Sequence, residues 1–376
     1  MRVLLPSHRR LALAGLTFVL TLATATLLWN RGREFGHEEA LRPTPGPALA
    51  PQTTINTTDY AQKLATLRAR LPMAQTAEQK RALAGEFGEL ALGAHNDNQG
   101  EGKLSLVAYD EALALQRAAK DSRGVAGTLM NRATTVAMLG KPKEAEVSLH
   151  EALALFEALP DSDLPRAEVL YRLGERLGLG GRYDEARTSL DCSLRIRQKF
   201  RERTGEADCM AALGQLAYEE AQYALARQFL GQAAQSFATL GKASSRAAVL
   251  GQLGDVALDE GEVAEAERLY TEGLAVWKEA KQDFWIGKFL VRQARVALAR
   301  KQWTQAEALA QESRRLLEVS NSPTSVAGPL MLLAEVAAQR GDRVRARALL
   351  TEARKLHELA GRAFGLRRVE QLLQKL

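Results

Sequence analysis

One feature constrains the fold of this chain more than any other: a pair of small residues twelve positions apart, repeated seven times. The first members are Gly93, Ala133, Gly174, Gly214, Gly254, Ala294 and Ala334, and the second members are Ser105, Ala145, Ala186, Ala226, Ala266, Ala306 and Ala346. Successive copies are 40 residues apart, except for one step of 41. A fixed period of this length is typical of a solenoid, whose units pack only on their neighbours.

Each copy is predicted to be a hairpin of two helices. In the copy from Arg166 to Phe200, a first helix is expected over 167–178, with one apolar face made of Val169, Leu170, Leu173 and Leu177. Small residues suit helix axes that cross about 8–10 Å apart. A glycine follows the first small residue by seven positions in five copies, at Gly100, Gly140, Gly181, Gly261 and Gly341, whereas Ala221 and Lys301 take that place in the other two. Glycine at this point is expected to end the first helix.

The ends of the chain differ from the repeats. Leu11–Trp29 is a nineteen-residue stretch without charge, long enough to span a bilayer as a helix. The alternative is a cleaved signal peptide, because Ala23-Thr24-Ala25 matches a cleavage pattern. The Pro-rich segment 31–58 is expected to be an extended spacer. At the other end, one face of 363–376 is apolar, which predicts a capping helix with a polar outer surface.

Charge and motifs exclude several classes of function. The net charge is +6, of which residues 1–42 carry +3, so the long remainder has no basic footprint for nucleic acid. No two of the five histidines share a helix face, and no nucleophile, phosphate-loop or zinc-protease motif occurs. The sequence therefore predicts a non-catalytic protein without cofactor or metal.

The repeat resembles the tetratricopeptide repeat (TPR). Its Leu-Gly pair stands at Leu92-Gly93, Leu173-Gly174, Leu213-Gly214 and Leu253-Gly254, and the resemblance covers residues 76–360. Units of 40 rather than about 34 residues are similar to the sensor arrays of bacterial regulators and to animal adaptor arrays. The resemblance implies an all-α, right-handed α-solenoid of about seven TPR-like hairpins with a C-terminal capping helix.

The expected division of the chain follows from these observations. Residues 1–30 form the anchor or signal, 31–58 the linker and 59–376 the solenoid, with hairpins near 79–120, 125–160, 166–201, 206–241, 245–281, 285–320 and 325–360 and a cap at 363–376. An anchor, a spacer and a TPR array are together similar to the tails of some bacterial receptor kinases and winged-helix regulators. The expected location is the bacterial cell membrane, single-pass, with the array extracytoplasmic, or secreted or periplasmic after cleavage near Ala25.

TPR arrays bind peptides or extended protein segments along a groove lined by their first helices. The matching positions in this chain are Glu168, Tyr171, Glu175, Asp208, Gln215, Asp255, Lys288 and Arg295. The groove is expected to be acidic in the middle, so that a basic or arginine-containing segment binds there, and basic towards its end. Two functions remain open: a scaffold for a protein or peptide partner, and the ligand-sensing part of a bacterial signalling system whose kinase or transcription regulator is encoded separately.

Overall fold

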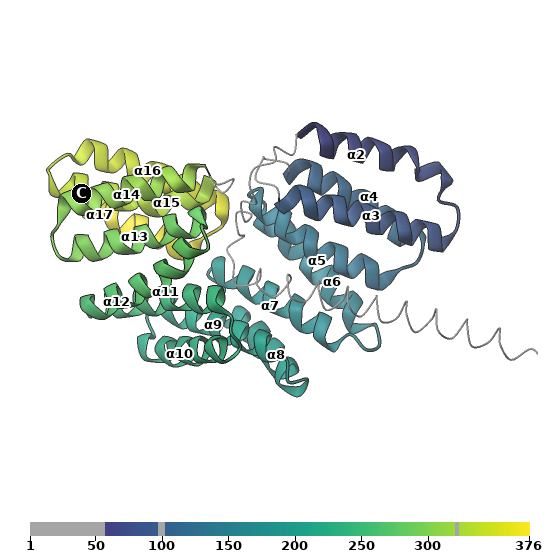
Figure 1. Cartoon of the computed structure of the whole chain (residues 1–376), viewed down its shortest axis with the longest axis horizontal. Helices are drawn as coiled ribbons and strands as arrows, with labels where there is room; N and C mark the ends of the chain where they lie inside the picture. The colour runs from purple at the N-terminus through teal and green to yellow at the C-terminus, as the bar shows by residue number, and fades with distance from the viewer. Residues whose placement is uncertain (1–56, 97–101, 320–322) are drawn as a thin grey trace, which may run out of the picture. The chain divides into compact units, whose positions relative to one another are not determined.

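The computed structural model describes residues 57–96, 102–319 and 323–376, and within these ranges it contains helices and turns but no strand (Figure 1). Contacts divide the chain into two units, Met1–Thr44 and Pro45–Leu376, and every described residue belongs to the second. The chain starts with α2 (Thr57–Ala69) and the 3-10 helix η1 (Leu71–Met73).

The following helices form seven consecutive pairs. They are α3 (Ala77–Asn96) with α4 (Gly102–Ala118), α5 (Ser122–Met138) with α6 (Pro142–Glu157), α7 (Asp163–Leu179) with α8 (Tyr183–Lys199), α9 (Arg203–Glu219) with α10 (Tyr223–Thr239), α11 (Ala243–Asp259) with α12 (Val263–Glu279), α13 (Asp283–Ala299) with α14 (Trp303–Glu318), and α15 (Ala327–Gln339) with α16 (Arg343–Ala360). The short η2 (Pro323–Val326) precedes α15, and α17 (Ala363–Gln374) ends the chain. The predicted all-α solenoid is confirmed.

The small residues lie where the two helices of a hairpin cross. A Cβ atom on Gly174 would come within 2.6 Å of Leu190, and one on Gly214 within 2.7 Å of Leu230. The second members of the pairs are equally enclosed, since Ala186 and Ala226 have no exposed surface. A larger side chain at these positions would push the helices apart, because protein interiors have no spare volume.

Every described turn within a hairpin contains one residue with positive φ. Gly181 has a φ of 80° and Gly261 one of 86°. Ala221 and Lys301, which stand where the glycines are expected, adopt the same conformation, with φ of 59° and 61°. The repeat geometry therefore imposes the left-handed turn even where the residue does not favour it.

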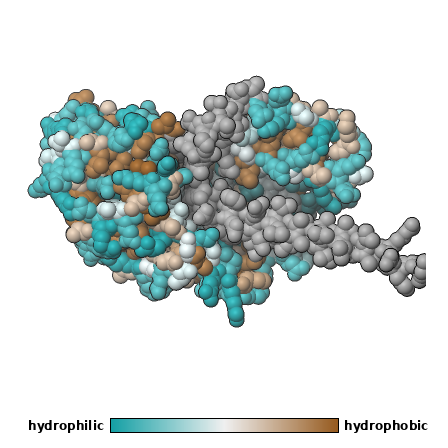
Figure 2. Space-filling view, in the orientation of Figure 1, coloured by the Kyte–Doolittle hydropathy of each residue, from teal (hydrophilic) through white to brown (hydrophobic). Residues whose placement is uncertain are grey.

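The first helices of the hairpins form a continuous layer. First helices of neighbouring hairpins contact each other directly: α7 contacts α9, and α11 contacts α13. Each second helix packs between the first helix of its own hairpin and the first helix of the next hairpin. We call α3, α5, α7, α9, α11, α13 and α15 the first-helix layer. On the face shown in Figure 2, hydrophilic residues cover most of the described surface and hydrophobic ones form small separate groups.

Both ends of the array are covered. Leu64 and Leu67 of α2 pack into the core of the first hairpin. At the other end, Val369 of α17 is fully buried in the core built by α11–α16, and Leu372 and Leu373 pack against it. The predicted C-terminal cap is therefore present.

The predicted location at the cell membrane is corrected by the structure. Among the described helices, none has both the length and the apolar character needed to cross a bilayer. The segment Leu11–Trp29, on which the single-pass anchor and the cleavage near Ala25 depended, lies outside the described residues, as does nearly all of the linker 31–58. Membrane attachment is therefore unsupported, and we withdraw the assignment.

Candidate functional site

A row of polar side chains runs along the first-helix layer. One residue at the same repeat position comes from each of five consecutive first helices: Glu175, Gln215, Asp255, Arg295 and Glu335. Each is half-buried, whereas the residues directly before and after it on the same helix are mostly buried. We call these five residues the polar row. It crosses the array from α7 to α15 and is the most continuous polar feature of this layer.

In the middle of the row, Asp255 forms ion pairs with two arginines. Its carboxylate accepts hydrogen bonds from Arg292 Nε at 3.0 Å, Arg295 Nη1 at 2.6 Å and the Tyr270 hydroxyl at 2.9 Å. Arg295 also pairs with Asp259 at 2.6 Å. Burial alone would raise the pKa of Asp255, but the two guanidinium groups outweigh it and hold that pKa below its ordinary value. We call these five residues the Asp255 cluster; its carboxylates are neutralised within the protein.

A second cluster, between α7 and α9, has a cation at its centre and carboxylates around it. The Arg197 side chain is 2% exposed and pairs with Glu168 at 2.6 Å and Glu202 at 2.7 Å. Its guanidinium also lies over the Tyr171 ring, with 5.7 Å to the centroid. Asp208 lies beside it, 1% exposed, and neither of its carboxylate oxygens has a hydrogen-bond partner. We call Arg197, Glu168, Glu202 and Asp208 the Arg197 cluster: Arg197 faces three carboxylates, of which Glu168 also pairs with Arg172 at 2.8 Å.

The local sequence makes room for Arg197. Glu202 caps the start of α9 by accepting from the Gly205 backbone N–H at 3.0 Å. A side chain on Gly205 would overlap the Arg197 guanidinium, so glycine is required there. The equivalent places hold the buried apolar residues Phe156, Phe237, Trp277 and Leu317 in four other hairpins, and the buried polar residues Gln116 and His357 in the first and last. An arginine at an apolar repeat position was therefore a sequence signal for this cluster that the groove prediction missed.

Burial changes the protonation of several predicted site residues. It raises the pKa of Glu175 to about 8, although a hydrogen bond from Tyr171 opposes the change. Burial also raises the pKa of Asp208 well above its usual value, despite the charge of Arg197. On α13, burial and the charges of Arg362 and Arg292 lower the pKa of Lys288 to about 7. Such perturbed groups are frequent at functional sites.

The C-terminal helix reaches back to hairpins far away in sequence. Arg367 Nη2 donates to the Tyr183 hydroxyl at 2.5 Å, and its guanidinium lies over the Tyr183 ring. The ring of Phe364 lies 5.7 Å from that of Tyr218. A Cβ atom on Gly181 would come within 2.9 Å of Ala363. α17 therefore contacts α8, α9 and the turn before α8, in addition to capping the last hairpin.

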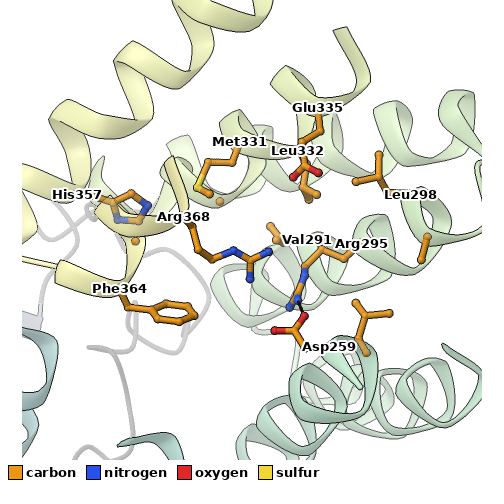
Figure 3. Close-up of a pocket in the computed structure, with 14 residues that line it drawn as sticks. Asp259, Val291, Arg295, Leu298, Met331, Leu332, Glu335, His357, Phe364 and Arg368 are labelled. Atoms are coloured by element: carbon orange, nitrogen blue, oxygen red, sulfur yellow. Dashed lines mark hydrogen bonds and ion pairs between the residues drawn. The ribbon is translucent and has the colours of Figure 1, made fainter. Parts of the chain in front are cut away.

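A pocket of about 360 Å³ lies between this C-terminal helix and the first-helix layer (Figure 3). Val291, Met331, Leu332 and Phe364 form its apolar walls. Figure 3 shows the guanidinium groups of Arg368 and Arg295 and the carboxylate of Glu335 directed towards the same space, with Asp259 paired to Arg295. The pocket therefore joins the end of the polar row, at Arg295 and Glu335, to α17.

The eight predicted groove residues fall into three groups. Glu168, Tyr171 and Asp208 come together around Arg197, with Glu175 hydrogen-bonded to Tyr171. Asp255 and Arg295 pair directly. Gln215 on α9 donates to Glu219, and Lys288 on α13 lies over the Phe284 ring. Tyr171 and Asp208 are buried, so neither is open to a partner. Glu168 and Asp255 are paired with arginines, which reduces the acidity expected for the middle of the groove. In the residues that the structure describes, no grouping of His, Cys, Asp and Glu could hold a metal ion.

Comparison with known proteins supports the repeat assignment. Residues 165–239 match the tetratricopeptide repeat family. Curated proteins include no match to this sequence.

Solved structures show the fold over most of the chain. A Rap protein complexed with Competence and Sporulation Factor is 18% identical, covers 80% of this chain and 81% of its own, and has a TM-score of 0.63. Aspartyl phosphate phosphatase F from Bacillus subtilis is 12% identical over 80% of this chain and 74% of its own, with a TM-score of 0.62. The Rap conjugation gene regulator of plasmid pLS20, in complex with the Phr* peptide, is 14% identical over 90% and 84%, with a TM-score of 0.60. Residues 165–239 thus carry a match to the tetratricopeptide repeat, and the described chain has the α-solenoid fold of TPR-like proteins.

Proposed function

We propose that this protein is a non-catalytic scaffold that binds a protein or peptide segment along the polar row of its first-helix layer. The observation that carries the proposal is the row itself, in which five consecutive first helices each place one half-buried polar side chain at the same repeat position. A partner that runs across the helices would meet these side chains one after another. Two of the structural neighbours are complexes with a peptide or a factor, which favours an extended peptide as the ligand.

The groups along the row favour a polar ligand over a strongly charged one. At one end of the row, the raised pKa of about 8 leaves Glu175 largely protonated at neutral pH, so its carboxyl group can both donate and accept a hydrogen bond. Near the other end, Arg295 is already paired with Asp255 and Asp259, and Glu335 follows it. A polar peptide segment that hydrogen-bonds to these side chains in turn is the ligand that fits best.

Selection from a random decapeptide display library on the full chain tests this proposal. The dissociation constant of a selected peptide is then measured for the wild type, for Glu175→Gln and for Arg295→Gln, with Glu352→Gln on the exposed side of α16 as control. We expect both row variants to weaken binding at least about tenfold, as the loss of a well-placed interface side chain typically does. Equal affinities for all four proteins would show that peptides bind elsewhere, and failure to select any peptide would contradict the scaffold proposal.

The sensory alternative uses the same surface. The structural neighbours include a gene regulator, and a regulatory array would also bind its signal along the first helices. The two functions differ in what the bound ligand does. Capture of a kinase or transcription regulator only in the presence of a selected peptide would favour the signalling role, whereas ligand-independent capture would favour the scaffold.

A further inference from the structure

The pocket between α13, α15 and α17 contains polar groups that the protein itself leaves unmatched. Among the described residues, Arg368 has no hydrogen-bond or ion-pair partner, although its guanidinium points into the pocket. His357 also lines the pocket, is only 8% exposed, and neither of its ring nitrogens has a partner. Buried polar groups in native proteins are nearly always hydrogen-bonded, so the unpartnered imidazole of His357, in the same pocket as the half-buried and unpaired guanidinium of Arg368, indicates a missing ligand.

The remaining walls specify the body of that ligand. Val291, Met331, Leu332 and Phe364 surround the space with apolar surface. A volume of about 360 Å³ lies within the usual range for small-ligand sites, about 300–1,000 Å³. An apolar side chain of the size of leucine or phenylalanine fits such walls, and a wholly polar ligand would lose hydration without compensation.

Among the described residues that line the pocket, one cation is left without a partner. Arg295 is already neutralised by Asp255 and Asp259, whereas Arg368 is not paired. The carboxylate of Glu335 lines the same pocket, but burial raises its pKa and so disfavours the charged form that would neutralise Arg368. A bound carboxylate would supply that counter-ion, and a guanidinium can bind it with two parallel hydrogen bonds.

We propose that this pocket binds the free C-terminal carboxylate of a peptide whose last side chain is apolar, with Arg368 as the carboxylate-binding residue. The inference rests on the proposed function, because the preceding residues of the peptide would continue along the polar row. His357 supplies a neutral imidazole, which can donate to a peptide carbonyl or accept from an N–H. The positions at which TPR arrays usually clamp a carboxylate hold Met130, Thr134, Tyr171 and Glu175 here, so this site is built differently.

The test uses the full chain and three small probes: acetyl-Ala-Ala-Phe, its C-terminal amide, and 3-phenylpropanoate. Their dissociation constants are measured by ligand-observed NMR for the wild type, for Arg368→Gln, and for Lys355→Gln as a control at an exposed position on α16. We expect the peptide acid to bind at least about tenfold more tightly than the amide and than 3-phenylpropanoate, and Arg368→Gln alone to abolish the preference for the acid.

Each other outcome would overturn the proposal. Equal binding of acid and amide would show that no carboxylate is recognised. Equal binding of peptide acid and 3-phenylpropanoate would show that the pocket takes a free organic acid. Absence of binding by all three would remove the pocket as a site. Selection of display peptides that depend on Glu175 would still support the polar row in each case, so failure of this inference is distinguishable from failure of the proposed function.

Discussion

The Asp255 and Arg197 clusters lie on neighbouring hairpins and differ in the sign of the central charge. Asp255 is an anion enclosed by two arginines and a tyrosine, and each of its oxygens has a partner. Arg197 is a cation among three carboxylates, and the third, Asp208, has no hydrogen-bond partner. A network in which every buried polar group has a partner stabilises the fold. A network that leaves a buried polar group without a partner lowers the free energy of unfolding. The comparison teaches that a carboxylate on one first helix, Asp255 on α11, is fully paired, whereas Asp208 on the preceding first helix, α9, is buried without a partner.

The largest effect should come from replacing the central cation. Arg197→Phe introduces the residue found at the equivalent position of two other hairpins, yet it leaves Glu202 and Asp208 without their counter-ion and Glu168 with Arg172 alone. We expect a loss of about 3–5 kcal/mol, as for a broken buried ion pair. Urea unfolding followed by circular dichroism measures it. Arg227→Gln, at an exposed pair with Glu260, should change stability by about 0–1 kcal/mol. A small effect for Arg197→Phe would mean that the cluster is as well solvated as a surface pair.

The comparison is tested most directly by one substitution made in both clusters. Asp255→Asn removes the charge that holds Arg292 and Arg295 and should cost about 2–3 kcal/mol. Asp208→Asn removes a charge that burial disfavours and should be neutral or stabilising, within about 1 kcal/mol. The two unfolding midpoints are compared with that of the wild type. Equal destabilisation by both variants would abolish the distinction between the clusters.

A smaller effect is expected from crowding Arg197 rather than removing it. Gly205→Ala places a methyl group against the guanidinium, and overpacking of this kind typically costs about 1–3 kcal/mol. The equivalent residue of the next hairpin is Ser245, which already carries a buried side chain. Ser245→Ala is therefore the matched control and should have the smaller effect. The reverse order in thermal unfolding would contradict the position assigned to Arg197.

The smallest expected effect is a pH dependence. Because the folded pKa of Glu175 is raised to about 8, its contribution to stability is complete below the unfolded value of about 4.3 and is lost as pH rises towards 8. The Tm of the wild type should therefore fall between pH 5 and pH 8 relative to that of Glu175→Gln, by roughly 1–3 °C. Scanning calorimetry at both pH values measures the difference. Parallel pH profiles for the two proteins would show that Glu175 is not buried enough to matter.

The local sequence was sufficient for the elements of the fold. A first helix was expected over 167–178, and α7 spans Asp163–Leu179. The turn glycines adopt positive φ as expected, and so do the exceptions Ala221 and Lys301. The small residues lie at helix crossings, and 363–376 forms the cap. These features depend on contacts within one hairpin or between neighbours, and a repeated pattern records such contacts directly.

The candidate site was predicted less well. Repeat phase placed Glu175, Asp255 and Arg295 on one layer, but it did not reveal that Asp255 is neutralised by Arg292 from the next hairpin. Nor did it show that Asp208 is buried, because its surroundings depend on Arg197, whose place is taken by a buried apolar side chain in four other hairpins. Burial and pairing depend on the neighbouring side chains, not on the position in the repeat alone.

The sequence by itself thus determined a helical solenoid and its terminal cap, because both follow from periodic, short-range packing. Only the tertiary structure decided that α17 contacts Tyr183 and Tyr218, and that a pocket remains between α17 and the first-helix layer. Those contacts join residues more than 140 positions apart in the chain. They depend on small rotations between hairpins that add up over several repeats, and no local pattern of residues encodes such a sum.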